Sequence, residues 1–147
     1  MAKQGKAGFG GLRYAPDGNG LYFVSDEPLG GTASEFRTLR FHAAGMDQPR
    51  QLSTPDWDVD AFELAKDGRH LAYVTNEDGI HRLTVLALPS HRPVRLPELP
   101  VGLIGGLELS PDGRQLAVTL NTATSPSDAH VIDLRAGRLE RWTKSEV

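Results

Sequence analysis

The sequence predicts an all-β protein built from three four-stranded antiparallel sheets. Three observations predict this fold. An Asp-Gly turn recurs three times with the same apolar residues around it, and each turn is followed by segments suited to two further strands. No apolar pattern with the 3.6-residue period of a helix persists anywhere in the 147 residues.

The Asp-Gly turns are the centres of an internal repeat. They lie at Asp17-Gly18, Asp67-Gly68 and Asp112-Gly113, which are 50 and 45 residues apart. Alternating apolar residues on both sides of an Asp-Gly pair are typical of two antiparallel strands joined by a tight turn. The same four places around each turn are apolar: Leu12, Tyr14, Leu21 and Phe23, then Phe62, Leu64, Leu71 and Tyr73, then Leu107, Leu109, Leu116 and Val118.

Each repeat continues with two more predicted strands. Four strands in a unit of about 45–50 residues is the size of one β-propeller blade. The partial propeller is expected over residues 9–147, after a flexible N-terminal arm at 1–8. Its third strands are expected at 36–41, 81–88 and 130–134, its fourth strands at 50–53, 94–96 and 138–143, and its blades at about 9–54, 59–99 and 104–143.

Three blades are fewer than the 4–8 of a closed propeller. A three-bladed arc leaves an apolar face bare at each end, and bare faces and strand edges favour association. The chain is therefore expected either to be a piece of a longer protein or to form a homo-oligomer. Two copies would supply six blades, which is enough to close a ring.

Composition excludes several function classes. A net charge of −3 and a pI of about 5.9 argue against nucleic-acid binding, which usually requires a basic face. The chain has no cysteine for a disulfide, a thiolate zinc site or a nucleophile. It has no membrane-length apolar segment, and no apolar run follows the basic residues Lys3 and Lys6 as in a signal peptide. We therefore expect a cytoplasmic protein without a membrane partner.

A search for catalytic chemistry points away from an enzyme. A nucleophile elbow needs the pattern Gly-x-Ser-x-Gly, and no serine here has glycines at that spacing. None of the five histidines forms a His-x-x-x-His pair, and most fall at predicted strand ends or turns, where a solvated ring is expected. We expect no catalytic residue, no metal ligand and no cofactor in this chain.

Two weaker patterns are centred on one segment. Asp56, Asp58 and Asp60, with Asp67 at the twelfth position, resemble a calcium loop, but Ala61 stands where that loop needs glycine. The pair Trp57-Asp58 spells the dipeptide of WD repeats, although it precedes a first strand and the other repeats lack it. The alternative to the calcium loop is a set of charged residues at the mouth of a strand. The alternative to the WD repeat is a tryptophan, Trp57, packed at a blade junction.

Two long loops are the candidate binding segments. Residues 26–35 and 121–128 are longer than the usual hairpin connection, and long loops on a rigid scaffold often carry binding residues. Glu35 and Arg37 flank the first loop and are candidates to bind the charged ends of a peptide. The alternative is that both are surface charges involved in strand pairing.

The turns Ala15-Pro16-Asp17-Gly18 and Ser110-Pro111-Asp112-Gly113 resemble the SPDG turn of TolB-like, PD-repeat propellers. Longer segments resemble, in family order, the N-terminal β-propeller of prolyl-oligopeptidase-family serine peptidases. These segments lie at 20–26, 35–39, 57–62, 76–79, 125–128 and 141–147. By this resemblance the chain corresponds to the C-terminal blades of that propeller.

In that family the propeller caps an α/β-hydrolase domain and restricts the entry of large substrates. The catalytic serine, aspartate and histidine belong to the hydrolase domain, which follows the propeller. The resemblance therefore implies a non-catalytic, substrate-gating segment, with the hydrolase domain of a parent peptidase as its partner. The alternative is a stand-alone TolB-like protein-interaction module that closes its ring with a second copy.

Overall fold

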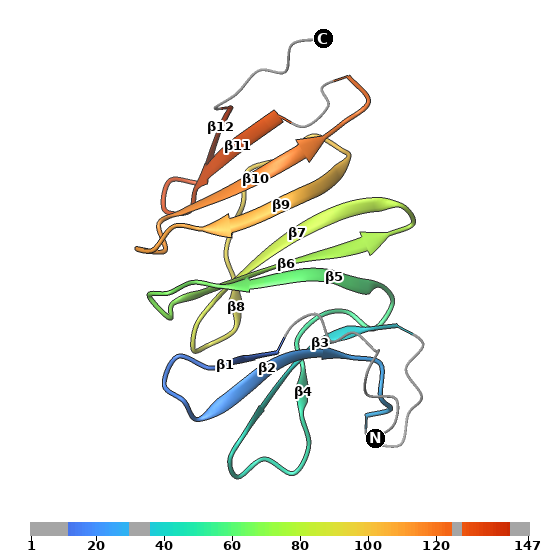
Figure 1. The fold of residues 1–147 in the computed structure, drawn as a ribbon, viewed down its shortest axis with the longest axis vertical. Coiled ribbons are helices and arrows are strands. Elements are labelled where there is room, and N and C mark those ends of the chain that lie inside the picture. The colour runs from blue at the N-terminus through green and yellow to red at the C-terminus, as the bar shows by residue number, and fades with distance from the viewer. Residues whose placement is uncertain (1–11, 30–35, 125–127, 142–147) are drawn as a thin grey trace. The chain divides into compact units, whose positions relative to one another are not determined.

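The computed structural model describes residues 12–29, 36–124 and 128–141. These residues form twelve strands and no helix, which confirms the all-β prediction (Figure 1). The strands make three four-stranded sheets, and within each sheet they follow in chain order. The first sheet contains β1 (Leu12–Tyr14), β2 (Gly20–Ser25), β3 (Thr38–Ala43) and β4 (Arg50–Gln51). The second contains β5 (Asp58–Leu64), β6 (His70–Glu77), β7 (Ile80–Ala87) and β8 (Arg92–Pro93), and the third β9 (Leu103–Leu109), β10 (Gln115–Asn121), β11 (Asp128–Asp133) and β12 (Arg138–Arg141).

The repeated turns have the same hydrogen bonds in all three sheets. In the first, the Ala15 N–H donates to the Gly20 carbonyl at 2.7 Å, and the Asp17 carboxylate accepts the Asn19 N–H at 2.9 Å. The glycine after each aspartate has a positive φ, between 71° and 77°, which a residue with a Cβ rarely adopts. The equivalent bonds are Ala65 to His70 and Arg69 to Asp67, then Ser110 to Gln115 and Arg114 to Asp112.

The second sheet has its fourth strand earlier than the sequence predicts. The prediction of a fourth strand at 94–96 is wrong, because β8 pairs with β7 only through Arg92 and Pro93. One further bond follows, from the Val94 N–H to the Val85 carbonyl at 2.8 Å. Pro97 and Pro100 lie just beyond, and proline has no N–H to continue a ladder.

The other predicted strands are close to the observed ones. The third strands begin at Thr38, Ile80 and Asp128, each within two residues of the expected start. The predicted arm at 1–8 and the end of the last fourth strand, 142–143, lie outside the described residues. The blade limits at 54 and 99 fall between sheets, those at 59 and 104 fall one residue inside β5 and β9, and all four remain predictions.

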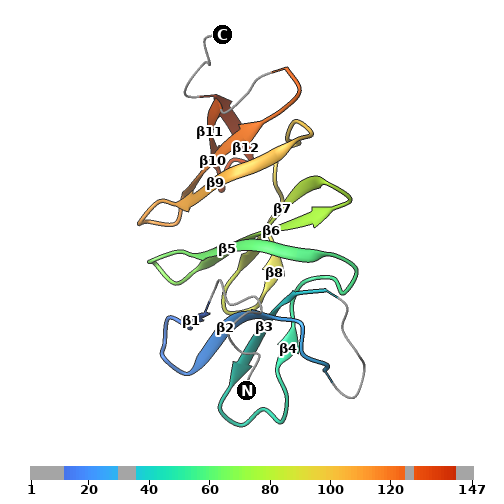
Figure 2. The same cartoon turned by 45° about the vertical axis from the view of Figure 1, so that its right-hand side comes forward.

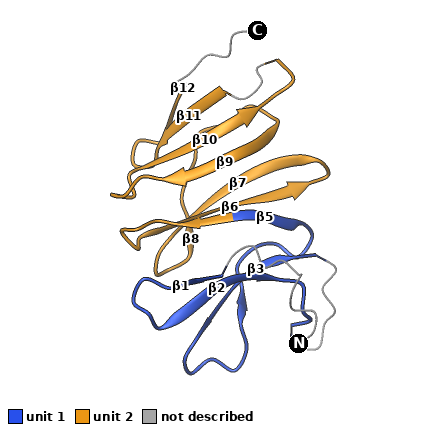
Figure 3. Ribbon diagram, in the orientation of Figure 1, with its two compact units in different colours: residues 1–61 blue, residues 62–147 orange. Residues whose placement is uncertain are grey.

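The chain divides into two compact units, residues 1–61 and 62–147 (Figure 3). The core of the second unit forms from β6 and β7 on one side and β9, β10 and β11 on the other, all of which can be followed in Figure 2. Its most deeply buried side chains include Leu116 and Ile132, both fully inaccessible to solvent. The second and third blades therefore share one continuous apolar core.

In the first unit, one face of the sheet carries exposed apolar side chains. Leu12 is paired with Phe23, and Tyr14 with Leu21, across the β1–β2 ladder. Directly paired residues project from the same face of a sheet, so these four side chains gather on one face. Leu12 and Tyr14 are 61% and 74% exposed. Their counterparts in the third blade belong to or pack against the core of the second unit: Leu107, Leu109, Leu116 and Val118.

Tyr22 is buried in the first unit, and its ring centroid lies 4.8 Å from that of Phe41. Burial, with the nearby charge of Asp17, raises the pKa of Tyr22 from 10.0 to about 12. The unfolded tyrosine therefore loses its proton first. The stability tied to this group is full below pH 10 and declines as the pH rises towards about 12.

We expect the urea midpoint of the wild-type chain to fall across this alkaline range. Tyr22→Phe should show a smaller fall, because phenylalanine cannot ionise. Part of the fall should remain in the variant, since burial also raises the pKa of Tyr73. Identical alkaline slopes for the two proteins would contradict the prediction.

Candidate functional site

Arg37 lies just before β3 and is bonded to the start of β5. Its backbone N–H donates to the Asp58 carboxylate at 2.8 Å, and its carbonyl accepts the Val59 N–H at 2.8 Å. Its guanidinium Nη2 is 3.4 Å from the Asp60 carboxylate and 3.7 Å from that of Asp58. The backbone of Arg37 therefore holds two distant parts of the first unit together, while its side chain forms an exposed ion pair.

The predicted partner of Arg37 in peptide binding, Glu35, lies outside the described residues. The structure instead brings Arg37 to Asp58 and Asp60, for which the sequence suggests either a calcium loop or charged residues at the mouth of a strand. One guanidinium beside two carboxylates presents both signs of charge at a half-exposed surface. Such a surface suits a ligand with an amine and a carboxylate, and the role of Glu35 and Arg37 in peptide binding stays a prediction.

The two aspartates should contribute unequally to stability. We expect Asp58→Ala to cost about 1–2 kcal/mol, because it leaves the Arg37 N–H without its acceptor. Asp60→Ala should cost less, about 0.5 kcal/mol, because its contact with the Arg37 guanidinium is a partly exposed ion pair. Urea denaturation of the two variants checks this, and equal losses would show that the backbone bond is not the stabilising contact.

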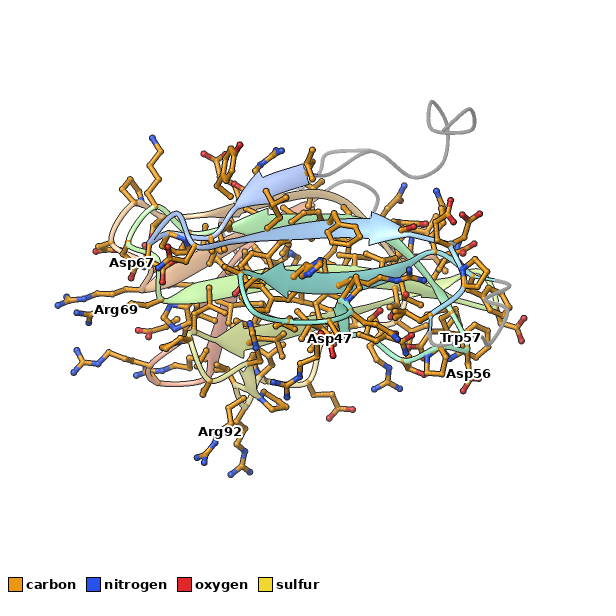
Figure 4. All side chains as sticks on the ribbon, turned by 90° about the horizontal axis from the view of Figure 1, so that it is seen from below. Asp47, Asp56, Trp57, Asp67, Arg69 and Arg92 are labelled. Carbon is orange, nitrogen blue, oxygen red and sulfur yellow. The ribbon has the colours of Figure 1, made fainter. Side chains whose placement is uncertain are left out.

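The segment that suggested calcium binding is engaged in other contacts. Asp58 and Asp60 are bonded to Arg37, and the Asp67 carboxylate accepts the Arg69 N–H of its own turn at 2.9 Å. Within 12–29, 36–124 and 128–141, no three His, Cys, Asp or Glu side chains are grouped as a metal site. Asp56 and Trp57 precede β5, where Figure 4 labels them, so the Trp-Asp pair stands at the start of a first strand.

The expectation of solvated histidines is wrong at two positions. The ring Nδ1 of His81 accepts the Ile104 N–H at 2.8 Å, and the backbone N–H of His81 donates to the Gly102 carbonyl at 3.0 Å. His130 is only 8% exposed and lies within β11. The sequence places His81 correctly near the start of a strand, but not beside β9, which lies more than twenty residues later in the chain.

Arg40 is a buried charge that the sequence analysis did not single out. It is 2% exposed, and its Nε donates to the Thr38 hydroxyl at 3.0 Å. Burial lowers its pKa, while the nearby charges of Asp26 and Glu27 raise it. No signal in the sequence marks this burial, because Arg40 alternates with Leu39 and Phe41 and so stands where a polar, solvent-facing residue is expected.

Two cavities lie within the second unit. The larger, of about 570 Å³, lies between the β6–β7 hairpin and residues 96–101 and is lined mainly by leucine, proline and other apolar side chains. The smaller, of about 390 Å³, lies among the β5–β6, β9–β10 and β11–β12 turns and is lined mainly by charged side chains. Neither could be predicted from the sequence, because the larger joins a hairpin to a segment more than ten residues later and the smaller joins turns of two different blades.

The fold and the shared turn chemistry define the class of this protein, which consists of β-propeller blades whose first two strands are joined by an Asp-Gly turn. Among solved structures, a prolyl endopeptidase matches 88% of this chain and 19% of its own, at 21% identity and a TM-score of 0.68. Dipeptidyl peptidase 4 of Porphyromonas gingivalis matches 90% of this chain and 18% of its own, at 18% identity and a TM-score of 0.67. TolB from Acinetobacter baumannii matches 97% of this chain and 34% of its own, at 15% identity and a TM-score of 0.65.

These matches confirm, at the level of the fold, the resemblance to TolB-like and prolyl-oligopeptidase-type propellers. The chain spans between 18% and 34% of the length of the three proteins. No family model matches the sequence, and no curated protein matches it. In the described part of the chain, no helix is long and apolar enough to cross a membrane.

Proposed function

We propose that this chain is a non-catalytic part of a larger β-propeller that gates substrate access in a serine peptidase of the prolyl-oligopeptidase type. Its role is to restrict and position substrates, while a separate α/β-hydrolase domain cleaves the bond. The matches to peptidase propellers support the fold in this proposal. The substrate and the hydrolase partner are parts of the proposal itself.

One observation carries the proposal: apolar side chains on one face of the first blade are exposed. Leu12 and Tyr14 are mostly exposed, whereas Leu107 and Leu109, their counterparts in the third blade, pack in or against a core shared with another blade. Because the first blade keeps the same apolar positions as the other two, its exposed face is suited to pack against a further blade. A longer parent chain with earlier blades supplies that neighbour.

Hydrolysis assays test the absence of catalysis. The purified chain is incubated with chromogenic aminoacyl and prolyl esters, and a prolyl endopeptidase serves as the positive control. We expect no release of chromophore above the uncatalysed rate. Release that scales with the concentration of the chain would overturn the non-catalytic role, whatever the chain's place in a propeller.

A second candidate function follows from the same exposed face. The chain is then a stand-alone, TolB-like interaction module that completes a six-bladed ring with a second copy. The outer face of the third blade supports this candidate. In the second blade the equivalent face packs against a neighbouring blade, because its Ala72, Val74 and Val85 are buried in the core of the second unit. The residues at the same positions of the third blade are Ala117, Thr119 and Val131.

Native mass by light scattering at two concentrations separates the two candidates. Ring completion predicts a dimer that becomes a monomer in the double variant Leu12→Ser, Tyr14→Ser. The matched control is Val101→Ser, which changes another exposed apolar residue and should leave the dimer intact. A well-folded monomer at micromolar concentration would exclude ring completion and leave the gating proposal standing.

A further inference from the structure

The smaller cavity of the second unit is formed by turns that the repeat places at one end of its blades. It has a volume of about 390 Å³, within the range of small-molecule sites. The β5–β6 turn, the β9–β10 turn and the β11–β12 turn surround it. Six charged or titratable side chains line it: Asp67, Arg69, His70, Asp112, Arg114 and Arg135.

The two aspartates of this cavity are engaged by their own turns. Asp67 accepts the Arg69 N–H at 2.9 Å. Asp112 accepts the Arg114 N–H at 3.0 Å and the Ser110 hydroxyl at 2.7 Å. These bonds, chiefly the one from Ser110, hold the pKa of Asp112 below its usual value, so this carboxylate stays charged and in place.

The three arginines are not engaged in the same way. Within the described residues, the guanidinium groups of Arg69, Arg114 and Arg135 form no hydrogen bond or ion pair at contact distance. Figure 4 labels Arg69 beside Asp67 and shows its side chain extending away from the ribbon. The charges of Arg114 and Arg135 still act on Asp112 and Asp133, but three guanidinium groups line the cavity against two carboxylates, and none of the three is fixed by a hydrogen bond within the described residues.

His70 supplies the independent observation. His70 lines the cavity, and its Nδ1 is buried with no hydrogen-bond partner within the described residues. A buried polar nitrogen without a partner costs free energy, so such groups usually mark a site for water, an ion or a ligand. A ligand oxygen in the cavity would satisfy this nitrogen and the guanidinium donors together.

We propose that this cavity binds a small organic oxyanion, held by the guanidinium groups of Arg69, Arg114 and Arg135 and by Nδ1 of His70. Guanidinium groups bind carboxylate and phosphate oxygens through paired, charge-assisted hydrogen bonds. The volume accommodates an organic group beside the anion. The proposal does not rest on substrate gating or on ring completion, because it is argued only from the residues that line this cavity.

The experiment is a titration of the full ¹⁵N-labelled chain with inorganic phosphate and, separately, with succinate. We expect saturable shifts of the Arg69, His70 and Arg114 amides with at least one of the two probes. A response to phosphate alone points to a phosphate ester, and a response to succinate alone to a carboxylate. Absence of saturable binding by both probes would overturn the proposal.

Variants separate a specific site from general attraction to positive charge. Arg114→Gln should weaken binding about tenfold or more, whereas Arg95→Gln, the same charge change at an exposed site outside the cavity, should leave it unchanged. His70→Asn keeps a donor near the position of Nδ1 and should bind better than His70→Leu. Equal weakening by the Arg114 and Arg95 variants would overturn the site, and Arg69→Gln replaces Arg114→Gln should that variant fail to fold.

Discussion

Leu116→Ala is expected to destabilise the second unit by about 2–5 kcal/mol. Leu116 is fully buried in β10 and packs in the core between the second and third blades. Truncation to alanine removes apolar contacts and leaves a cavity. Strand β10 is paired with β9 on one side and with β11 on the other, so the core cannot close freely around that cavity.

Urea denaturation followed by circular dichroism measures this loss. Leu103→Ala is the matched control, because it makes the same chemical change in the neighbouring strand β9 at a side chain that is 43% exposed. We expect the control to cost less than about 1 kcal/mol. Similar losses for the two variants would mean that the second and third blades do not share a packed core.

Gly113→Ala is expected to cost about 2–3 kcal/mol, more than the same change at Gly137. Both glycines have a positive φ, 71° and 66°, so alanine is strained at either position by about 1–2 kcal/mol. A Cβ at Gly137 meets open space, whereas one at Gly113 meets the Asp67 carboxylate. Asp67 can move away only by giving up its bond to the Arg69 N–H.

This contact is tested by chemical denaturation of the two glycine variants, of Asp67→Ala, and of the double variant Asp67→Ala, Gly113→Ala. The two substitutions should be less than additive, because Asp67→Ala removes the side chain that the new Cβ displaces. Full additivity would show that Asp67 and Gly113 do not touch in solution. The comparison thus measures how the turns of two successive blades fit together.

The candidate sites were less predictable than the fold. Arg37 was singled out for its place beside a long loop, but its contacts with Asp58 and Asp60 depend on a strand more than twenty residues later. His70 and Arg114 follow Asp-Gly turns, and no pattern in the sequence marks either as a site residue. Their shared cavity exists only because two blades lie side by side in the second unit.

The sequence by itself determined the repeat, the all-β class and the position of each Asp-Gly turn. These depend on local chemistry: glycine accepts a positive φ, aspartate bonds its own backbone, and alternating apolar residues define the faces of a strand. The tertiary structure alone decided which of the repeated apolar positions are buried. Leu12 and Leu107 occupy equivalent places, yet Leu12 is exposed while Leu107 packs against the core, because burial requires a neighbouring blade and a single repeat cannot specify its neighbour.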